Sequence, residues 1–192
     1  MISSSVGVNS QAQDSIQPMG WTSEMVAQHF NISRAKQDEY ALISHTRASK
    51  AVERNVFEDE IVPIKIGEKR IDRDDTVRAG VTAESLATLK PVFPDWGMAT
   101  TTAGNASGVG DGAGLLILTR RKTAEREGMQ ILGKWIDCVL VGVEPRHMGI
   151  GPIAAIPKLL ERNGITKEDI DIFEVQSSSL SNNANAESYQ DQ

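Results

Sequence analysis

Few residues of this sequence could take part in chemistry. Cys138 is the only thiol, and the three histidines lie far apart in the chain. Cys138 falls within an apolar run without a basic neighbour, which predicts a small buried hydrophobe rather than a reactive thiolate. His147 lies in a Pro/Gly-rich turn, but no carboxylate or cysteine stands at a fixed spacing from it, so a structural or surface role is favoured. The residues therefore predict neither a catalytic set nor a metal site.

The most distinctive segment is rich in glycine. Residues 101–114 read TTAGNASGVGDGAG, with five glycines among small residues. Such a segment lets a ligand or another backbone approach closely, and it also suits a tight loop packed against a neighbouring domain. Within it, GVGDGA fits the dinucleotide pattern G-x-G-x-x-G/A, but a predicted strand follows where a helix should begin, so that function is disfavoured. GMQILGK resembles a phosphate-binding loop, but Trp135 stands where a magnesium-binding hydroxyl is required.

The charge distribution excludes some partners. The 192 residues hold 20 Lys+Arg and 26 Asp+Glu, a formal net charge of -6. An acidic chain is a poor general binder of nucleic acid or anionic membranes. One loose basic group stands out, and it could be a solvated loop or a local phosphate-binding patch. It comprises Lys65, Lys69, Arg70, Arg73 and Arg78.

The remaining composition is ordinary. One cysteine excludes an internal disulfide framework, and no apolar run approaches 18 residues, so no membrane span is expected. The length suggests one to one and a half domains of an intracellular protein. Residues 1–16 and 176–192 are small and polar, and we expect both to be disordered tails.

The elements that must position these residues alternate between helix and strand, which predicts an α/β fold. A helix capped by Thr22 or Ser23 should run to Phe30, with Met25, Val26 and Phe30 on its apolar side, and Ser33 should cap a second. The other expected helices cover 34–54, 83–89, 122–127 and 152–162, with a capped turn at 166–169. The expected strands cover 60–66, 115–118, 131–143 and 170–175, and 67–80 should be a charged loop. The strand at 60–66 should lie at a sheet edge because Pro63 cannot donate to a ladder, and the strand at 131–143 alternates between its two faces.

Four segments together resemble the 3-ketoacyl-CoA thiolases, most closely their peroxisomal branch. They are MGWTSEMVAQHFNISRAKQDEYAL, ESLATLKPVF, TTAGNASGVGDGAG and GVEPRHMGIGPIAAIPKLLERNGITKEDIDIFEV, in the family's order and spacing. The similarity covers about residues 17–175. It implies a partial thiolase fold of αβαβα layers. Residues 17–98 would be the loop domain, 99–128 the end of the N-terminal domain and 129–175 the start of the C-terminal domain.

The resemblance implies an acyl-CoA:acetyl-CoA acyltransferase of fatty-acid β-oxidation. Thiolysis needs a thiolate, a histidine that activates it, a second acid/base and donors for the oxyanion. The family's nucleophilic cysteine precedes the matching segment, and its NEAF, GHP and C-x-G-x-G motifs follow IDIFEV, where this sequence reads QSSS. We therefore expect a truncated or mis-spliced segment that is inactive alone.

Coenzyme A binding is what the resemblance carries over, with coenzyme A as a substrate and no cofactor. Arg78 and Ser85 would lie near the adenine and nucleotide phosphates. The pantetheine arm and acyl tunnel would be lined by Phe93, Ala103, Gly104, Ser107, Met19 and Met148.

Partners and compartment follow from the same resemblance. The expected partners are coenzyme A or acyl-CoA and a second subunit, as a homodimer or with a full-length thiolase. A non-catalytic coenzyme A-binding or dimerisation module and a non-functional fragment remain alternatives. A peroxisomal location is implied by resemblance only, because neither terminus contains a visible import signal.

Overall fold

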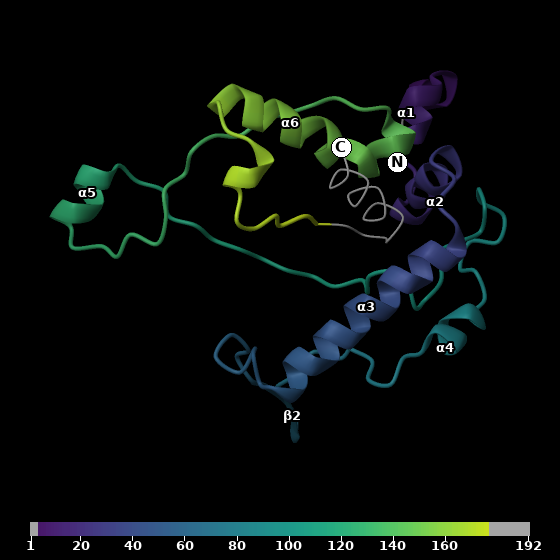
Figure 1. The fold of residues 1–192 in the computed structure, drawn as a ribbon, viewed down its shortest axis with the longest axis horizontal. Coiled ribbons are helices and arrows are strands. Elements are labelled where there is room, and N and C mark those ends of the chain that lie inside the picture. Colours follow the sequence, from purple (N-terminus) through teal and green to yellow (C-terminus); the bar gives the residue numbers. More distant parts are fainter. Residues whose placement is uncertain (1–3, 177–192) are drawn as a thin grey trace.

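Helices dominate the regular structure. The computed structural model describes residues 4–176, in which the only sheet has two strands (Figure 1). In chain order the elements are η1 (Ser4–Val8), α1 (Ser10–Asp14), α2 (Met19–His29), α3 (Arg34–Glu53), β1 (Ile64–Ile66), β2 (Lys69–Ile71), α4 (Ala83–Ala87), α5 (Arg121–Arg126), η2 (Pro145–Ile150), α6 (Gly151–Asn163) and η3 (Lys167–Asp169).

The ends of most helices follow local signals. The Ser33 side chain accepts from Lys36 N at 3.2 Å and caps α3, as predicted. Helix α6 has Pro152 in its first turn and ends before Gly164, whose φ of 63° is left-handed. Helices α4 and α5 and the capped turn at 166–169 also form where they were expected.

Helix α2 begins earlier than predicted. Pro18, not Thr22 or Ser23, occupies the N-cap. Thr22 lies inside the helix, where its hydroxyl donates to Met19 O at 2.9 Å. Proline has no N–H to lose at a helix start and holds φ near −65°, so it begins the helix without a side-chain cap.

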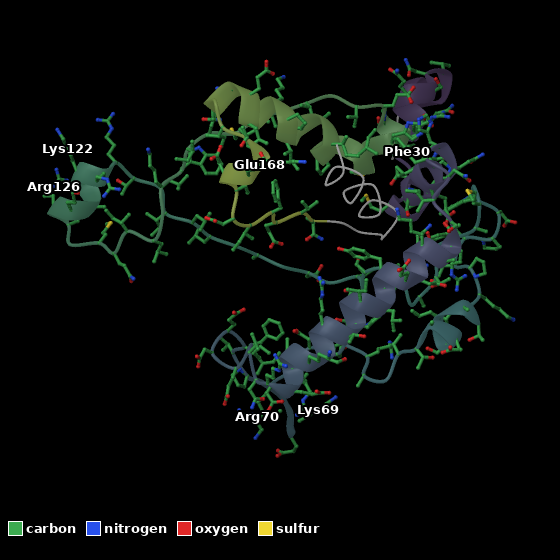
Figure 2. The ribbon with its side chains drawn as sticks, viewed as in Figure 1. Phe30, Lys69, Arg70, Lys122, Arg126 and Glu168 are labelled. Carbon is green, nitrogen blue, oxygen red and sulfur yellow. The ribbon has the colours of Figure 1, made fainter. Side chains whose placement is uncertain are left out.

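The apolar core is small and centred on α2. Val26, Ala27 and Ile32 form its buried cluster, and Ile150 of η2 packs against it. Phe30, expected on the apolar side, is exposed at the end of α2 (Figure 2). Contacts of η2 with α1, α2 and α6, and of α3 with α4, join most of the other helices.

The predicted edge strand is shorter and has a partner. Only Ile64–Ile66 is extended as a strand, and it pairs antiparallel with Lys69–Ile71 through a turn in which Gly67 has φ of 61°. The second strand lies within residues that were expected to be a loop. Pro63 immediately precedes the hairpin, because a proline within it would remove a ladder donor.

The other predicted strands are wrong. Residues 115–118, 131–143 and 170–175 have no assigned strand, and Leu115–Leu118 are 70 to 90% exposed. A strand needs a neighbour for its backbone N–H and C=O groups, and no described segment pairs with these three. The α/β prediction therefore holds for the helices but not for these three strands.

The prediction of a disordered N-terminal tail is also wrong for its described part. Residues 4–14 form η1 and α1, where Asn9 Oδ1 accepts from Ala12 N at 3.0 Å. Asp14 then pairs with Arg146 at 2.8 Å, which joins α1 to η2. Apart from Gln176, the predicted C-terminal tail lies outside the described residues.

Candidate functional site

The glycine-rich segment divides into an anchored part and an exposed part. Thr100, Thr101, Thr102 and Asn105 are buried, whereas residues 107–120 are exposed throughout. Thr102 bridges to Pro91, and Val92 N donates to Thr101 O at 2.8 Å. The GVGDGA sequence lies in the exposed part, and no helix follows it before Arg121. This order agrees with the argument against a dinucleotide site.

Gly104 lies where three parts of the chain meet. A Cβ at this position would stand 2.6 Å from side-chain carbons of both Leu86 and Leu89. On the other side, His45 Nε2 of α3 lies 3.2 Å from Gly104 O. The absence of a side chain lets α4 approach the backbone, so glycine is needed here for packing. The adjacent Ala103 is exposed.

Ser85 and Arg78 are both exposed. Ser85 belongs to the capping box of α4, in which its Oγ donates to Thr82 O at 2.8 Å and accepts from Thr82 N at 3.0 Å. Arg78 is exposed, and its carbonyl accepts from Ser49 Oγ of α3 at 3.4 Å. Arg78 therefore joins its loop to α3, whereas Ser85 stabilises the start of α4, and both residues remain at the surface.

A second group forms around the start of α2. A Cβ on Gly20 would lie 2.1 Å from the ring of Phe93, so that ring packs directly on the α2 backbone. Phe93 also stacks on Trp96, with ring centroids 4.6 Å apart. Met19 precedes this contact, and Met148 lies in η2, which packs on α2. Met19 and Met148 are 42% and 43% exposed.

The expected lining residues thus fall into two groups. Ser85, Ala103 and Gly104 lie about α4, and Met19 and Phe93 lie about α2. Ser107 follows the anchored segment and is exposed.

His147 takes part in the contact between η2 and α2. Its ring centroid is 4.5 Å from that of His29, and its Nδ1 is 3.1 Å from Glu144 Oε2. Burial lowers the pKa of His147 below its ordinary value and the neighbouring His29 lowers it further, while Glu144 opposes the shift. These contacts fit the structural role predicted for His147.

Cys138 is exposed, so its prediction as a buried hydrophobe is wrong. Residues 131–143, predicted as a strand around it, form no strand and are not paired with another described segment. Its N–H bonds to Asp137 Oδ1 at 2.8 Å, and Arg162 approaches its carbonyl at 3.5 Å. Within residues 4–176, no group of three or more His, Cys, Asp and Glu side chains could hold a metal ion.

The predicted basic group lies on the hairpin and in the loop that follows it, away from the basic residues of α5. Figure 2 places Lys69 and Arg70 on the hairpin and Lys122 and Arg126 on α5, well apart. On the hairpin side, Lys65 pairs with Glu68 at 3.8 Å and Arg70 with Asp72 at 3.1 Å, both at the surface. These pairs are typical of a solvated charged loop.

Sequence reasoning missed the side chains that anchor the glycine-rich segment. Glu24 is fully buried, and its carboxylate accepts from Thr100 N at 3.0 Å, Thr101 N at 2.7 Å and Thr100 Oγ1 at 3.1 Å. Asn105 and Asp38 join this arrangement from the segment itself and from α3. One signal was present: Gln37 and Asp38 lie one helical turn before Ala41, so the three share one face of α3, and this face is buried.

No helix among residues 4–176 is long and apolar enough to cross a membrane.

Comparison with known proteins identifies relatives for nearly the whole chain. Residues 2–122 match the family described as "Thiolase, N-terminal domain", and residues 129–186 match "Thiolase, C-terminal domain". The peroxisomal 3-ketoacyl-CoA thiolase A of Candida tropicalis is 47% identical over 176 residues, covering 87% of this chain and 42% of that protein. The corresponding thiolase A of Mus musculus is 46% identical over 183 residues, covering 91% of this chain and 43% of that protein.

Solved structures agree. The dimeric peroxisomal thiolase of Saccharomyces cerevisiae matches with a TM-score of 0.85 and 42% identity, over 98% of this chain and 48% of that one. A human mitochondrial 3-ketoacyl-CoA thiolase in complex with CoA matches with a TM-score of 0.82 and 35% identity, over 93% of this chain and 45% of that one. The chain therefore spans less than half the length of these relatives.

Proposed function

Because the chain belongs to the thiolase family, we propose that it forms the coenzyme A-binding part of a 3-ketoacyl-CoA thiolase. The proposed substrate class is coenzyme A and its 3-ketoacyl thioesters, and the reaction of the whole enzyme is thiolytic release of acetyl-CoA. Relatives named as peroxisomal 3-ketoacyl-CoA thiolases, at 46 to 48% identity, support this choice. For the same reason we propose the peroxisome as the compartment.

The proposed domain organisation follows the thiolase pattern. Residues 17–98 form the loop domain, 99–128 the end of the N-terminal domain, and 129–175 the start of the C-terminal domain. The two family matches support a division between residues 122 and 129.

One observation carries the proposal about coenzyme A. Gly104 packs against Leu86 and Leu89, which brings Ala103 and Gly104 to the helix that bears Ser85. In the proposed complex, Arg78 and Ser85 contact the nucleotide phosphates. The exposed small residues of the turn leave room for the narrow pantetheine arm, and Phe93, Ser107, Met19 and Met148 continue the channel.

These 192 residues alone are proposed not to catalyse thiolysis. A thiol nucleophile needs a base within hydrogen-bond reach. Cys138 is exposed, and its contacts with Asp137 and Arg162 are made by its backbone N–H and carbonyl. A thiolysis assay with acetoacetyl-CoA and coenzyme A should give no acetyl-CoA above background, and turnover by the purified chain would refute this statement.

Calorimetric titration tests coenzyme A binding. Saturable binding is expected, with 3'-phospho-ADP competing. Arg78→Ala should weaken it by about tenfold, because a phosphate loses a charge-assisted bond. Arg73→Ala is the matched control, since Arg73 lies in the same loop beside Asp72 at 3.9 Å. A titration without saturable heat would contradict the proposed binding of coenzyme A.

A second candidate function is a dimerisation module that pairs with another thiolase subunit. The exposure of Leu115–Leu118 favours it, because an unpaired apolar segment leaves its backbone groups open to pairing with another chain. Analytical ultracentrifugation should then give a discrete dimer, or a stoichiometric complex with an added full-length thiolase. A monomer in both measurements contradicts this candidate.

A further inference from the structure

The turn that holds Ala103 and Gly104 is closed by its own side chains. Asn105 Oδ1 accepts from Thr102 N at 2.8 Å, and Thr102 Oγ1 accepts from Gly104 N at 3.2 Å. Both Thr102 and Asn105 are almost completely buried. The turn is therefore rigid within itself, and its position depends on what Asn105 and its neighbours contact elsewhere.

Asn105 attaches this turn to α3. Its Nδ2 donates to Asp38 Oδ1 at 3.0 Å and to Thr100 O at 3.0 Å. Asp38 is 67 residues away along the chain. The amide thus uses both donors and its acceptor, and each connection has good geometry.

Glu24 attaches the preceding residues to α2. Its carboxylate accepts from Thr100 and Thr101, as described above, and Gly97 lies so close that a Cβ there would stand 2.9 Å from Glu24 O. A buried carboxylate is costly unless donors surround it, and here neutral donors of one segment do so. This arrangement fixes where the segment enters the turn.

Arg34 extends the network to α4. Its Nε lies 2.7 Å from Asp38 Oδ2, and its Nη2 donates to Leu86 O at 2.6 Å and Leu89 O at 3.2 Å. Asp38 therefore uses one oxygen for the turn and the other for the arginine that holds the end of α4. The Asp38 carboxylate thus holds both the turn and, through Arg34, the end of α4, which form two walls of the proposed coenzyme A channel.

We propose that Asn105, Glu24 and Arg34 are positioning residues for coenzyme A: Asn105 and Glu24 fix the turn for the pantetheine arm, and Arg34 fixes α4 for the nucleotide. The inference rests on the function proposed above. None of the three needs to touch the ligand. They order the segment before coenzyme A binds, so the free energy of binding is not reduced by the cost of ordering it.

Two variants, one isosteric and one charge-conserving, test the contributions of the two ends of coenzyme A separately. Asn105→Asp loses both donors and sets a carboxylate against Asp38, while Arg34 keeps its bonds to α4. We expect affinity for coenzyme A to fall by about tenfold and affinity for 3'-phospho-ADP to change by less than about twofold. Arg34→Lys keeps the charge beside Asp38 but loses the fork to the two carbonyls, and it should weaken binding of both ligands.

The control has the same chemistry at a different place. Asn163 Nδ2 donates to Asp137 Oδ2 at 3.3 Å and Leu159 O at 2.9 Å, so Asn163→Asp makes a matched substitution outside the network. It should leave both affinities unchanged. If Asn105→Asp loses the helical circular dichroism signal, Glu24→Gln, which keeps one acceptor oxygen, is measured in its place.

The outcomes are distinct. Wild-type protein that binds neither ligand overturns the proposed function, and the positioning roles with it. Wild-type binding with unchanged affinities in the folded variants overturns the positioning roles alone. An equal loss for coenzyme A and 3'-phospho-ADP in Asn105→Asp assigns that residue a general structural role and overturns its assignment to the pantetheine arm.

Discussion

Two regions of this molecule have similar apolar content but differ in how they bury it. In the anchored region, residues 19–105, helices and a polar network enclose Val26, Ala41 and Leu86. In the extended region, residues 106–144, only Ala124 is buried, although Leu116, Trp135 and similar side chains are present. Figure 1 shows α5 standing apart at the end of two long extended segments of this region.

The difference teaches that helices and strands depend on their surroundings to different degrees. A helix satisfies its backbone hydrogen bonds internally, so α2 and α3 form and then bury one face. A strand satisfies them only with a neighbour, so the apolar segments of the extended region remain uncovered without one. Substitutions that remove a buried contact should therefore cost more stability in the anchored region than in the extended one.

Removing the central carboxylate should unfold much of the anchored region. Glu24→Ala leaves the buried N–H groups of Thr100 and Thr101 without acceptors, at about 1–3 kcal/mol each. Urea unfolding followed at 222 nm should therefore give a loss of about 3 kcal/mol or more. Glu39→Ala, on the exposed side of α3, should stay within about 0.5 kcal/mol. Equal midpoints for the two variants would contradict the network's role.

The same substitution in the two regions should have unequal effects. Leu86→Ala opens a cavity under α4 and should cost about 2–4 kcal/mol. Leu116 is 82% exposed, so Leu116→Ala should change the free energy of unfolding by less than about 0.5 kcal/mol. A large loss for Leu116→Ala would mean that this segment is covered in solution, by a second copy or by another part of the enzyme.

A methyl group at Gly20 should disturb the proposed pantetheine wall. Its Cβ would overlap the Phe93 ring, which must move and separate from Trp96. We expect about 1–3 kcal/mol of destabilisation and a reduced near-ultraviolet circular dichroism signal. Gly110→Ala, where nothing lies within 4 Å of the new methyl, is the control. An unchanged tryptophan signal in Gly20→Ala would show that this contact does not persist.

Acidification should weaken the contact between η2 and α2. The pKa of His147 is lowered in the folded state by burial and by His29, so the unfolded chain binds more protons at mildly acidic pH. Stability should fall as pH drops below about 6.5, the ordinary histidine value, and level off below the lowered pKa. Comparing urea midpoints at pH 7.5 and 5.5 should give a smaller difference in His147→Gln than in wild type.

Glu144 sharpens this last test. Its carboxylate raises the pKa of His147 and partly offsets the burial. Glu144→Gln should therefore make the loss of stability on acidification larger than in wild type. If both variants kept the wild-type pH dependence of stability, protonation of His147 would not be coupled to the contact between η2 and α2.

Residues close together in the chain were enough to predict much of the helical structure. Ser33 before α3, the Thr82–Ser85 pair at α4 and Gly164 after α6 act through hydrogen bonds and dihedral preferences that span a few residues. The family resemblance was equally readable, because motifs such as TTAGNAS are contiguous. The start of α2 was predicted wrongly because Pro18 and Thr22, which lie within five positions, both suit the beginning of a helix.

Burial and strand pairing were decided only when distant parts of the chain met. Glu24 gains its donors from residues 76 and 77 positions away, and Asn105 reaches Asp38 across 67. No local pattern encodes such a partner, since the cost of burying a charge depends on which groups surround it. The same dependence explains the strands: alternation in residues 131–143 reports a preference for an extended backbone, but a neighbouring strand must complete the ladder.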